Sequence, residues 1–336
     1  MAAAAGGAPL LELRGLHVSF ATRAGEVPAV RGVDLALRAG ETLALVGESG
    51  SGKTVCALAV MGLVDPPGRV VRGSVWFDGR ELTALPAREL RRLRGRRIAM
   101  VFQEPMTSLN PVFTVGDQVA EVLRIHLRMK AKQARDEVIG LLYRVGIPSP
   151  ESRVDAYPHE LSGGMKQRVM IAMAIACKPD LLIADEPTTA LDVTIQAQIM
   201  ELLAALQREM GMAILLITHN LGVVAHYTRE IAVMYAGKLV ERAPVREIFA
   251  RPEHPYTRAL LRSLPRPDRA HEPLEAIPGT VPSPLELPKG CAFADRCAQV
   301  LPRCPSDPPR LVAIRQDHAA ACWLHEAVVA AGPEPA

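Results

Sequence analysis

The chain has 336 residues, of which 49% are apolar and 22% are charged, and its formal net charge is +3. This composition is typical of a globular protein and excludes a disordered one, while the length predicts one large domain with an appendage, or two domains. The small net charge does not indicate a nucleic acid as partner. No apolar run approaches the roughly 18 residues of a membrane-spanning helix.

The N-terminal part of the chain predicts a leader followed by an antiparallel sheet. Residues 1–9 are rich in alanine and glycine and lack the basic start of a signal peptide, so we expect a flexible leader on a cytosolic protein. Apolar and polar residues alternate between residues 11 and 45, and Asp78-Gly79 after an apolar run is a hairpin signal. Phe20 lies on this sheet, where its ring could stack on a nucleotide base or simply pack, and the sequence favours neither.

A phosphate-binding loop is the clearest motif. Gly47-Glu48-Ser49-Gly50-Ser51-Gly52-Lys53-Thr54 matches G-x-x-x-x-G-K-[ST], with an apolar strand-like run before it and a helix-compatible run after it. Backbone N–H groups at the start of that helix would bind phosphate oxygens. Lys53 would reach the β- and γ-phosphates, and Thr54 would offer its hydroxyl to Mg²⁺. The candidate nucleotide-binding residues of the loop are Gly47, Ser49, Gly50, Ser51, Gly52, Lys53 and Thr54.

The middle of the chain is predominantly helical. Six arginines between Arg88 and Arg97 could bind a polyanion, but no aromatic residues interleave with them, so we favour a solvated helix and turn. A buried-strand run ends at Gln103, and helical periodicity then continues from Val112 to Gly146. Ser162, Gly163 and Gly164 precede another helical run, which predicts a second helix N-terminus and a second possible anion site.

Two apolar strands near the middle of the chain end in polar side chains. Residues 181–184 are followed by Asp185 and Glu186, and residues 213–217 by Thr218 and His219. Polar groups at the carboxyl ends of parallel strands line the ligand crevice of an open α/β sheet. Asp185 is therefore a candidate Mg²⁺ ligand, and Glu186 a candidate base for the attacking water. Residues 231–235 and 238–240 predict a closing hairpin.

In their order and spacing, these motifs resemble the ATP-binding cassette (ABC) ATPases over about residues 10–250. Leu161 to Gln167 resembles the family's signature, with Met165 where many members have glutamine. The resemblance implies an α/β fold: a phosphate-loop core sheet, an antiparallel β subdomain and an inserted helical signature subdomain at about 104–175. It also implies that Gln103 contacts Mg²⁺ and takes part in catalysis, together with Lys53, Glu186 and His219.

Within that family, the sequence most resembles the ATPase subunits of dipeptide and oligopeptide importers. Residues 103–111, residues 254–257 and a C-terminal extension with four cysteines carry this narrower resemblance. It implies a cassette domain at 10–255, followed by an extension at 256–336 that is rich in proline between residues 265 and 309. We expect Cys291, Cys297, Cys304 and Cys322 to form a metal site, because cytosolic thiols stay reduced. A [4Fe–4S] cluster is favoured over zinc, and independent thiols are the third interpretation.

The resemblance also implies partners and a location. Two cassettes would pair head to tail, here with a related but distinct chain, so that Ser162, Gly163 and Gly164 contact the ATP held by the partner. Residues 104–111 would contact two membrane permease subunits, served indirectly by an extracytoplasmic solute-binding protein, at the cytoplasmic face of the membrane. Nickel or another solute is the alternative cargo. A soluble non-transport ABC ATPase and a regulatory module that holds ATP without hydrolysing it are the alternative functions.

Overall fold

The structure is a computed structural model in which two compact units are described. The described residues are 8–103, 108–189, 191–264 and 276–325. One unit, the phosphate-loop unit, comprises residues 11–36, 43–83 and 218–336, and the other, the signature unit, comprises residues 1–10, 37–42 and 84–217. Within the described ranges, no helix is both long and apolar enough to cross a membrane.

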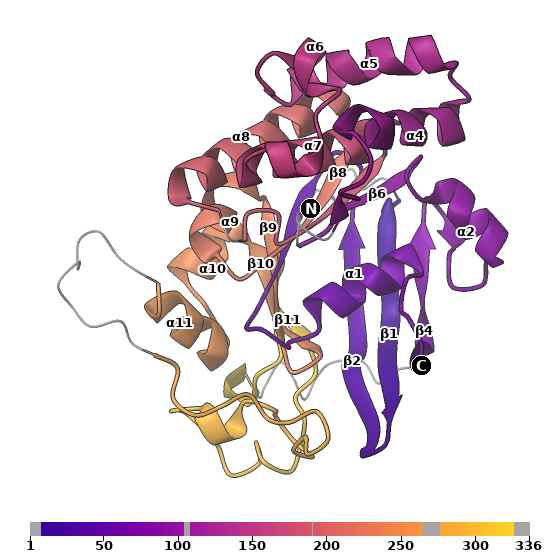
Figure 1. The fold of residues 1–336 in the computed structure, drawn as a ribbon. Helices are drawn as coiled ribbons and strands as arrows, with labels where there is room; N and C mark the ends of the chain where they lie inside the picture. The colour runs from indigo at the N-terminus through magenta and orange to yellow at the C-terminus, as the bar shows by residue number, and fades with distance from the viewer. Residues whose placement is uncertain (1–7, 104–107, 190, 265–275, 326–336) are drawn as a thin grey trace. The chain divides into compact units, whose positions relative to one another are not determined.

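The phosphate-loop unit contains an antiparallel four-stranded sheet of order β2-β1-β4-β5, in which β2, β1 and β4 lie side by side (Figure 1). Its strands are β1 (Leu11–Thr22), β2 (Gly25–Leu37), β4 (Gly68–Phe77) and β5 (Arg80–Glu81). Asp78 and Gly79 join β4 to β5 with φ angles of 49° and 73°, which is the geometry of a tight hairpin turn. The predicted hairpin is therefore confirmed.

The same unit holds strands in the order β11-β12-β10-β9-β3. They are β3 (Thr42–Val46), β9 (Glu230–Tyr235), β10 (Lys238–Pro244), β11 (Val312–Arg315) and β12 (His318–Ala320). β3 and β9 pair in parallel, whereas β9 and β10 form the predicted antiparallel hairpin. The helices of the unit are α1 (Lys53–Met61), α9 (Leu221–Tyr227), α10 (Val245–Ala250) and α11 (Pro255–Arg262).

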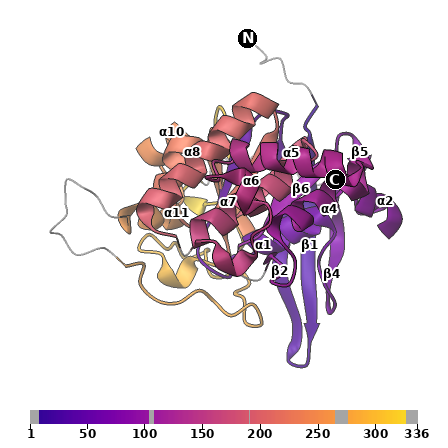
Figure 2. The ribbon, with the colours of Figure 1, turned by 45° about the horizontal axis from the view of Figure 1, so that its top comes forward.

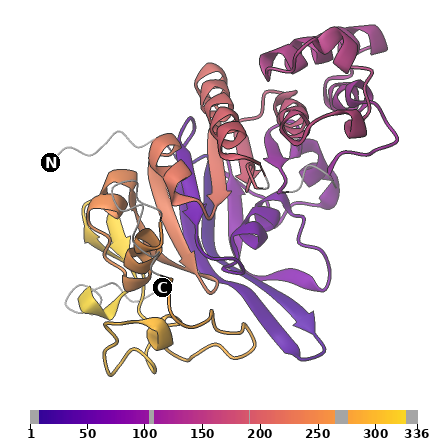
Figure 3. The ribbon, with the colours of Figure 1, turned by 60° about the vertical axis from the view of Figure 1, so that its left-hand side comes forward.

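The C-terminal segment adds two strands, β11 and β12, to this sheet. β12 pairs with β10, with Ala320 opposite Glu241, and in Figure 3 the yellow C-terminal strands lie beside the orange strands. Short 3-10 helices at Ala294–Arg296 and Trp323–His325 lie in the otherwise irregular segment. Phe293 packs in one core cluster with Tyr235 and Tyr256. The segment thus shares the core of the phosphate-loop unit.

The signature unit combines parallel strands with a group of helices. Its strands, in the order β8-β7-β6, are β6 (Ile98–Val101), β7 (Leu181–Asp185) and β8 (Ala213–Thr218). Its helices are α2 (Ala87–Leu93), α4 (Val115–Leu127), α5 (Ala131–Arg144), α6 (Pro150–Arg153), α7 (Gly163–Ile175) and α8 (Val193–Met210). Figure 2 shows α4, α5, α6 and α7 gathered together.

Helical periodicity correctly predicted the buried faces of α4 and α5. Val115, Val119 and Leu123 are buried at spacings of four residues along α4, and Val138 and Leu142 are buried along α5. The two helices are separate because Arg128, directly after α4, has a φ of 55°. The first part of the arginine-rich stretch forms α2, none of whose side chains is buried, as expected of a solvated helix, and Arg94, Arg96 and Arg97 follow it in the predicted turn.

Candidate functional site

The phosphate loop connects β3 to α1 in the phosphate-loop unit. A Cβ at Gly47 would collide with the Met234 carbonyl oxygen of the neighbouring strand β9, so the loop needs glycine where it leaves the sheet. α1 then begins at Lys53, directly after Gly52. The predicted order of strand, glycine-rich loop and helix is therefore present, with backbone N–H groups at the start of α1.

Lys53 is the buried cation of this loop, with a relative exposure of 5%. Its Nζ donates to the carbonyl oxygens of Gly47 and Glu48, each at 2.9 Å, and to the Ser51 hydroxyl at 3.4 Å. The ammonium group therefore contacts residues at both the start and the later part of the loop. A phosphate oxygen at the loop would find this charge already oriented by the backbone around it.

The carboxylates expected at the end of β7 are present in the signature unit. Asp185 is the last residue of β7 and is only 2% exposed. Glu186 follows with a φ of 45°, and its N–H donates to the Ile217 carbonyl at 2.8 Å. The Glu186 carboxylate accepts from Gln103 Nε2 at 3.1 Å and from Thr189 Oγ1 at 2.8 Å.

Two of the predicted catalytic residues, Gln103 and Glu186, are thus in direct contact although they lie 83 residues apart. The sequence reasoning missed Thr189, whose hydroxyl also binds the Glu186 carboxylate. The available signal was its position in the polar turn three residues after a strand-end glutamate, within reach of that side chain. Together, the amide and the hydroxyl orient an acceptor that is suited to a water molecule.

The signature segment starts α7 as the sequence predicted. Ser162 is the N-cap of this helix, and its Oγ accepts from the Met165 N–H at 3.4 Å. Gly163 and Gly164 form the first turn, and both Ser162 and Gly163 are exposed. Exposed N–H groups at the start of a 13-residue helix suit an anion, as the expected contact with a partner's nucleotide requires.

His219 and Phe20 both lie in the phosphate-loop unit. His219 is exposed in the turn between β8 and α9, before the N-cap Asn220. Phe20 is half-buried on β1, opposite Gly68 on β4, and a Cβ at Gly68 would collide with its ring. The ring therefore packs within the sheet, and base stacking by Phe20 stays a prediction.

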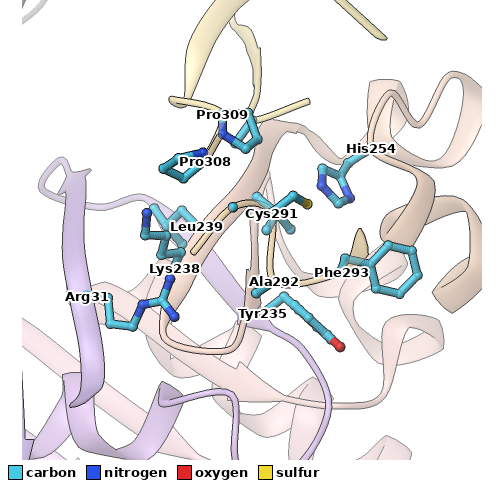
Figure 4. A pocket seen from close by; sticks show the side chains of 13 residues that line it. Arg31, Tyr235, Lys238, Leu239, His254, Cys291, Ala292, Phe293, Pro308 and Pro309 are labelled. Atoms are coloured by element: carbon cyan, nitrogen blue, oxygen red, sulfur yellow. The ribbon is translucent and has the colours of Figure 1, made fainter. Parts of the chain in front are cut away.

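The four cysteines of the extension lie around one small cavity. Cys291, Cys297, Cys304 and Cys322 all line it, together with His254 and Trp323. Cys291 also borders a neighbouring cavity with Arg31 and Lys238 at its rim (Figure 4). Burial raises the pKa of the Cys322 thiol to about 11. In the described part of the chain, no group of three or more His, Cys, Asp or Glu side chains is arranged to hold a metal ion, so the structure does not support the expected metal site.

Comparisons with known proteins show the family of this chain. Residues 30–189 match the family described as "ABC transporter", and residues 240–304 match "Oligopeptide/dipeptide transporter, C-terminal region". The oligopeptide transport ATP-binding protein of Salmonella typhimurium is 52% identical over 300 residues, which cover 89% of each chain. The dipeptide transport ATP-binding protein of Bacillus subtilis is 49% identical over 318 residues, covering 94% of this chain and 95% of that protein.

The fold comparison gives the same class. An ATP-binding cassette solved as a dimer in a post-hydrolysis state with ADP and phosphate superposes with a TM-score of 0.64 at 28% identity, covering 70% of this chain and 99% of that one. The phosphate loop, the strand-end carboxylates and the signature helix together define a phosphate-loop ATPase of the cassette type. The chain belongs to the ABC transporter ATPases that carry the oligopeptide/dipeptide C-terminal region.

Proposed function

We propose that this chain hydrolyses ATP to power the import of dipeptides or oligopeptides through a membrane permease. The observation that carries the proposal is its similarity, over nearly the whole chain, to proteins named as dipeptide and oligopeptide transport ATP-binding proteins. The match of residues 240–304 to the C-terminal region of such transporters favours peptide over nickel or another solute. It also favours an importer subunit over a soluble ABC ATPase.

ATP and Mg²⁺ are expected for an ABC ATPase, and the residues of both units have the chemistry to bind them. We assign the phosphate contacts to Lys53 and the N–H groups of the loop, and the Mg²⁺ contacts to Thr54, Gln103 and Asp185. Mg²⁺ neutralises charge on the phosphate oxygens. Glu186, oriented by Gln103 and Thr189, takes the proton from the attacking water, and His219 is assigned to orient that water.

We assign Ser162, Gly163 and Gly164 to the γ-phosphate of ATP on a second cassette, because they lie at the start of α7, where Ser162 and Gly163 are exposed. ATP binding would then favour the closed pair, and hydrolysis the open one. We propose a related but distinct ATPase as that second chain, and two permease subunits as membrane partners. We propose that residues 104–111 contact the permease; of these, 104–107 lie outside the described residues. A solute-binding protein would act indirectly, and the chain would be peripheral at the cytoplasmic face.

Affinity purification of the chain from solubilised membranes tests the transport assignment. We expect a permease and a second ATPase chain to copurify, because a cassette of an importer works only in that assembly. Identifying the ligand of the associated solute-binding protein then separates peptide from nickel. Recovery of the chain alone from the soluble fraction, with full ATPase activity, would favour the soluble ABC ATPase instead.

We also propose that the four cysteines hold an iron–sulfur cluster, with zinc as the alternative. The proposal rests on the four cysteines Cys291, Cys297, Cys304 and Cys322 lining one cavity, since four thiolates are a ligand set for [4Fe–4S]. It requires the described side chains to rearrange, because they are not arranged to hold a metal ion. Iron and acid-labile sulfide analysis of anaerobically purified protein tests it, with a visible absorbance band as the expected result. Colourless protein with one bound zinc would contradict the cluster.

A further inference from the structure

Glu48, the second residue of the phosphate loop, is bound at its backbone by Tyr256 and at its carboxylate by Arg296, both from the C-terminal extension. Its backbone N–H donates to the hydroxyl oxygen of Tyr256 on α11 at 2.9 Å. Its two carboxylate oxygens accept from Arg296 Nη1 at 2.8 Å and from Arg296 Nη2 at 3.1 Å. Arg296 lies 248 residues further along the chain. A paired contact of this kind fixes both the position and the orientation of the carboxylate.

Arg296 is itself rigidly held. Its side chain is only 5% exposed, its Nε donates to the Pro278 carbonyl at 2.8 Å, and its Nη1 donates to the Tyr235 hydroxyl at 3.2 Å. Its backbone closes a 3-10 helix between Cys291 and Cys297, two of the clustered cysteines. The guanidinium group is therefore held by contacts other than Glu48, and through the ion pair it restrains the position of Glu48 in the loop.

Glu48 also binds the phosphate-loop lysine, as Gly47 does. The Glu48 carbonyl oxygen accepts from Lys53 Nζ at 2.9 Å and from the Ser51 N–H at 3.2 Å. A displacement of Glu48 would therefore move both the lysine ammonium and the N–H groups that face the phosphates. Binding sites of this kind depend on supporting contacts that hold each group to within a fraction of an ångström.

We propose that Arg296 is a positioning residue for the phosphate loop and acts through Glu48, so that the C-terminal segment sets the affinity of the chain for ATP. The inference rests on the proposed function, because it assigns the loop to ATP. It gives the extension a role in the nucleotide site in addition to its place in the core. Arg296 contacts Glu48 of the loop, so we expect its effect to be on nucleotide binding more than on the chemical step.

A double-mutant cycle on the full-length chain tests the proposal. Arg296→Met and Glu48→Gln each remove the ion pair with little change of shape. With a fluorescent ATP analogue and Mg²⁺, we expect each variant to raise the dissociation constant about five- to tenfold, and the KM for ATP similarly, with a smaller change in kcat. The double variant should bind no more weakly than either single variant, because both remove the same contact. Arg296→Lys, which keeps the charge, should restore part of the affinity.

Arg242→Met is the matched control. Arg242 forms a comparable paired contact with Glu230 in the same unit, at 2.8 and 3.0 Å, away from the phosphate loop. We expect it to change thermal stability and leave ATP affinity within twofold of wild type. If Arg296→Met does not fold, Glu48→Gln and Arg296→Lys carry the test.

The proposal is wrong if wild type binds the analogue and the single variants bind it within twofold of wild type. It is also wrong if their effects add in the double variant. A wild-type chain that binds no nucleotide would overturn the proposed function and, with it, this role of Arg296.

Discussion

Glu186 has an unfavourable backbone conformation, and its carboxylate accepts two side-chain hydrogen bonds. Its φ of 45° is rare for a residue other than glycine and costs of the order of 1–3 kcal/mol. Gln103 and Thr189 both donate to its carboxylate. Such strain is retained where the surrounding structure requires a side chain to point in one direction. We therefore assign proton transfer to Glu186 rather than to a neighbouring group.

Glu186→Gln tests this assignment. The amide keeps the size of the side chain and cannot accept a proton, so ATP turnover should fall by roughly 10²–10⁴-fold while nucleotide binding is retained. Phosphate release and nucleotide binding are measured on the same sample. Lys53→Ala is the contrasting variant, because loss of its charge should weaken nucleotide binding itself. Unchanged hydrolysis by Glu186→Gln would show that another group removes the proton.

At the scale of single residues, local sequence pattern predicted the phosphate loop, the carboxylates at the end of β7 and the N-cap of α7, because each depends on residues adjacent in sequence. Family resemblance named both Gln103 and Glu186 as catalytic residues, but their contact was not predicted, since the two are 83 residues apart. The contact of Glu48 with Arg296 could not be predicted. Neither residue carries a pattern that points to the other, and an arginine in a proline-rich segment is ordinarily exposed.

At the scale of elements, the start of α7 is packed closely against α8. A Cβ on Gly164 would lie 2.9 Å from Ile195 Cγ2, too close for two carbon atoms. The glycine therefore does more than expose backbone donors, because it also allows the two helices to approach each other. This second requirement depends on a contact between helices and could not be read from the signature motif.

Gly164→Ala should destabilise the chain by about 1–3 kcal/mol, because Ile195 must shift to make room for the methyl group. Gly140→Ala is the matched control: Gly140 lies within α5, and nothing is within 4 Å of the position of its Cβ. This control should stabilise the chain by about 0.5–1 kcal/mol, because alanine favours a helix. Thermal unfolding compares the two variants. Equal effects would contradict the packing argument.

The N-terminus of α11 contains a histidine whose neutral form the structure requires. His254 is buried, and its Nδ1 accepts from the Tyr256 N–H at 3.0 Å. Burial lowers the pKa of His254 to about 4, although the nearby Glu241 acts in the opposite direction. An unfolded chain would take up this proton near pH 6.5. Because the unfolded state binds more protons between pH 6.5 and 4, stability falls as the pH is lowered through this window.

Thermal unfolding at pH 7, 6 and 5 measures this dependence. The His254 contribution amounts to roughly 3 kcal/mol of stability across the full window, so the melting temperature should fall progressively on acidification. His254→Asn keeps a hydrogen-bond acceptor and removes the titration, and its melting temperature should fall less steeply. Parallel pH profiles for the two proteins would show that His254 does not carry the effect.

The extension shows where element prediction failed. No strand was predicted in the extension, but β11 and β12 form after its proline-rich part at residues 265–309, and β12 pairs with β10. Both strands are very short, and β11 has no buried residue, so there is little alternation for a sequence pattern to detect. β12 is fixed by its pairing with β10, in which Glu241 lies opposite Ala320 from far along the chain, and β11 pairs with β12. No local signal specifies the pairing with β10.

At the scale of the whole molecule, the extension belongs to the phosphate-loop unit in both its sheet and its core. Arg296 reaches the phosphate loop, and Phe293 packs against Tyr235 and Tyr256. Parts of the fold with strong periodicity, such as α4 and α5, were predicted from local sequence. The place of the extension in the sheet and core of the phosphate-loop unit was not predicted, because it depends on contacts between residues far apart in sequence.

The central claim is that ATP hydrolysis by this chain powers peptide import. It is tested most directly by peptide uptake into proteoliposomes that contain the complete transporter, with ATP and Mg²⁺ on the side of the ATPase and the solute-binding protein on the other. We predict that wild-type transporter accumulates a labelled peptide only with ATP, and that the Glu186→Gln transporter, assembled equally well, accumulates none. Equal uptake by the two transporters, or ATP hydrolysis without any peptide uptake, would contradict the claim.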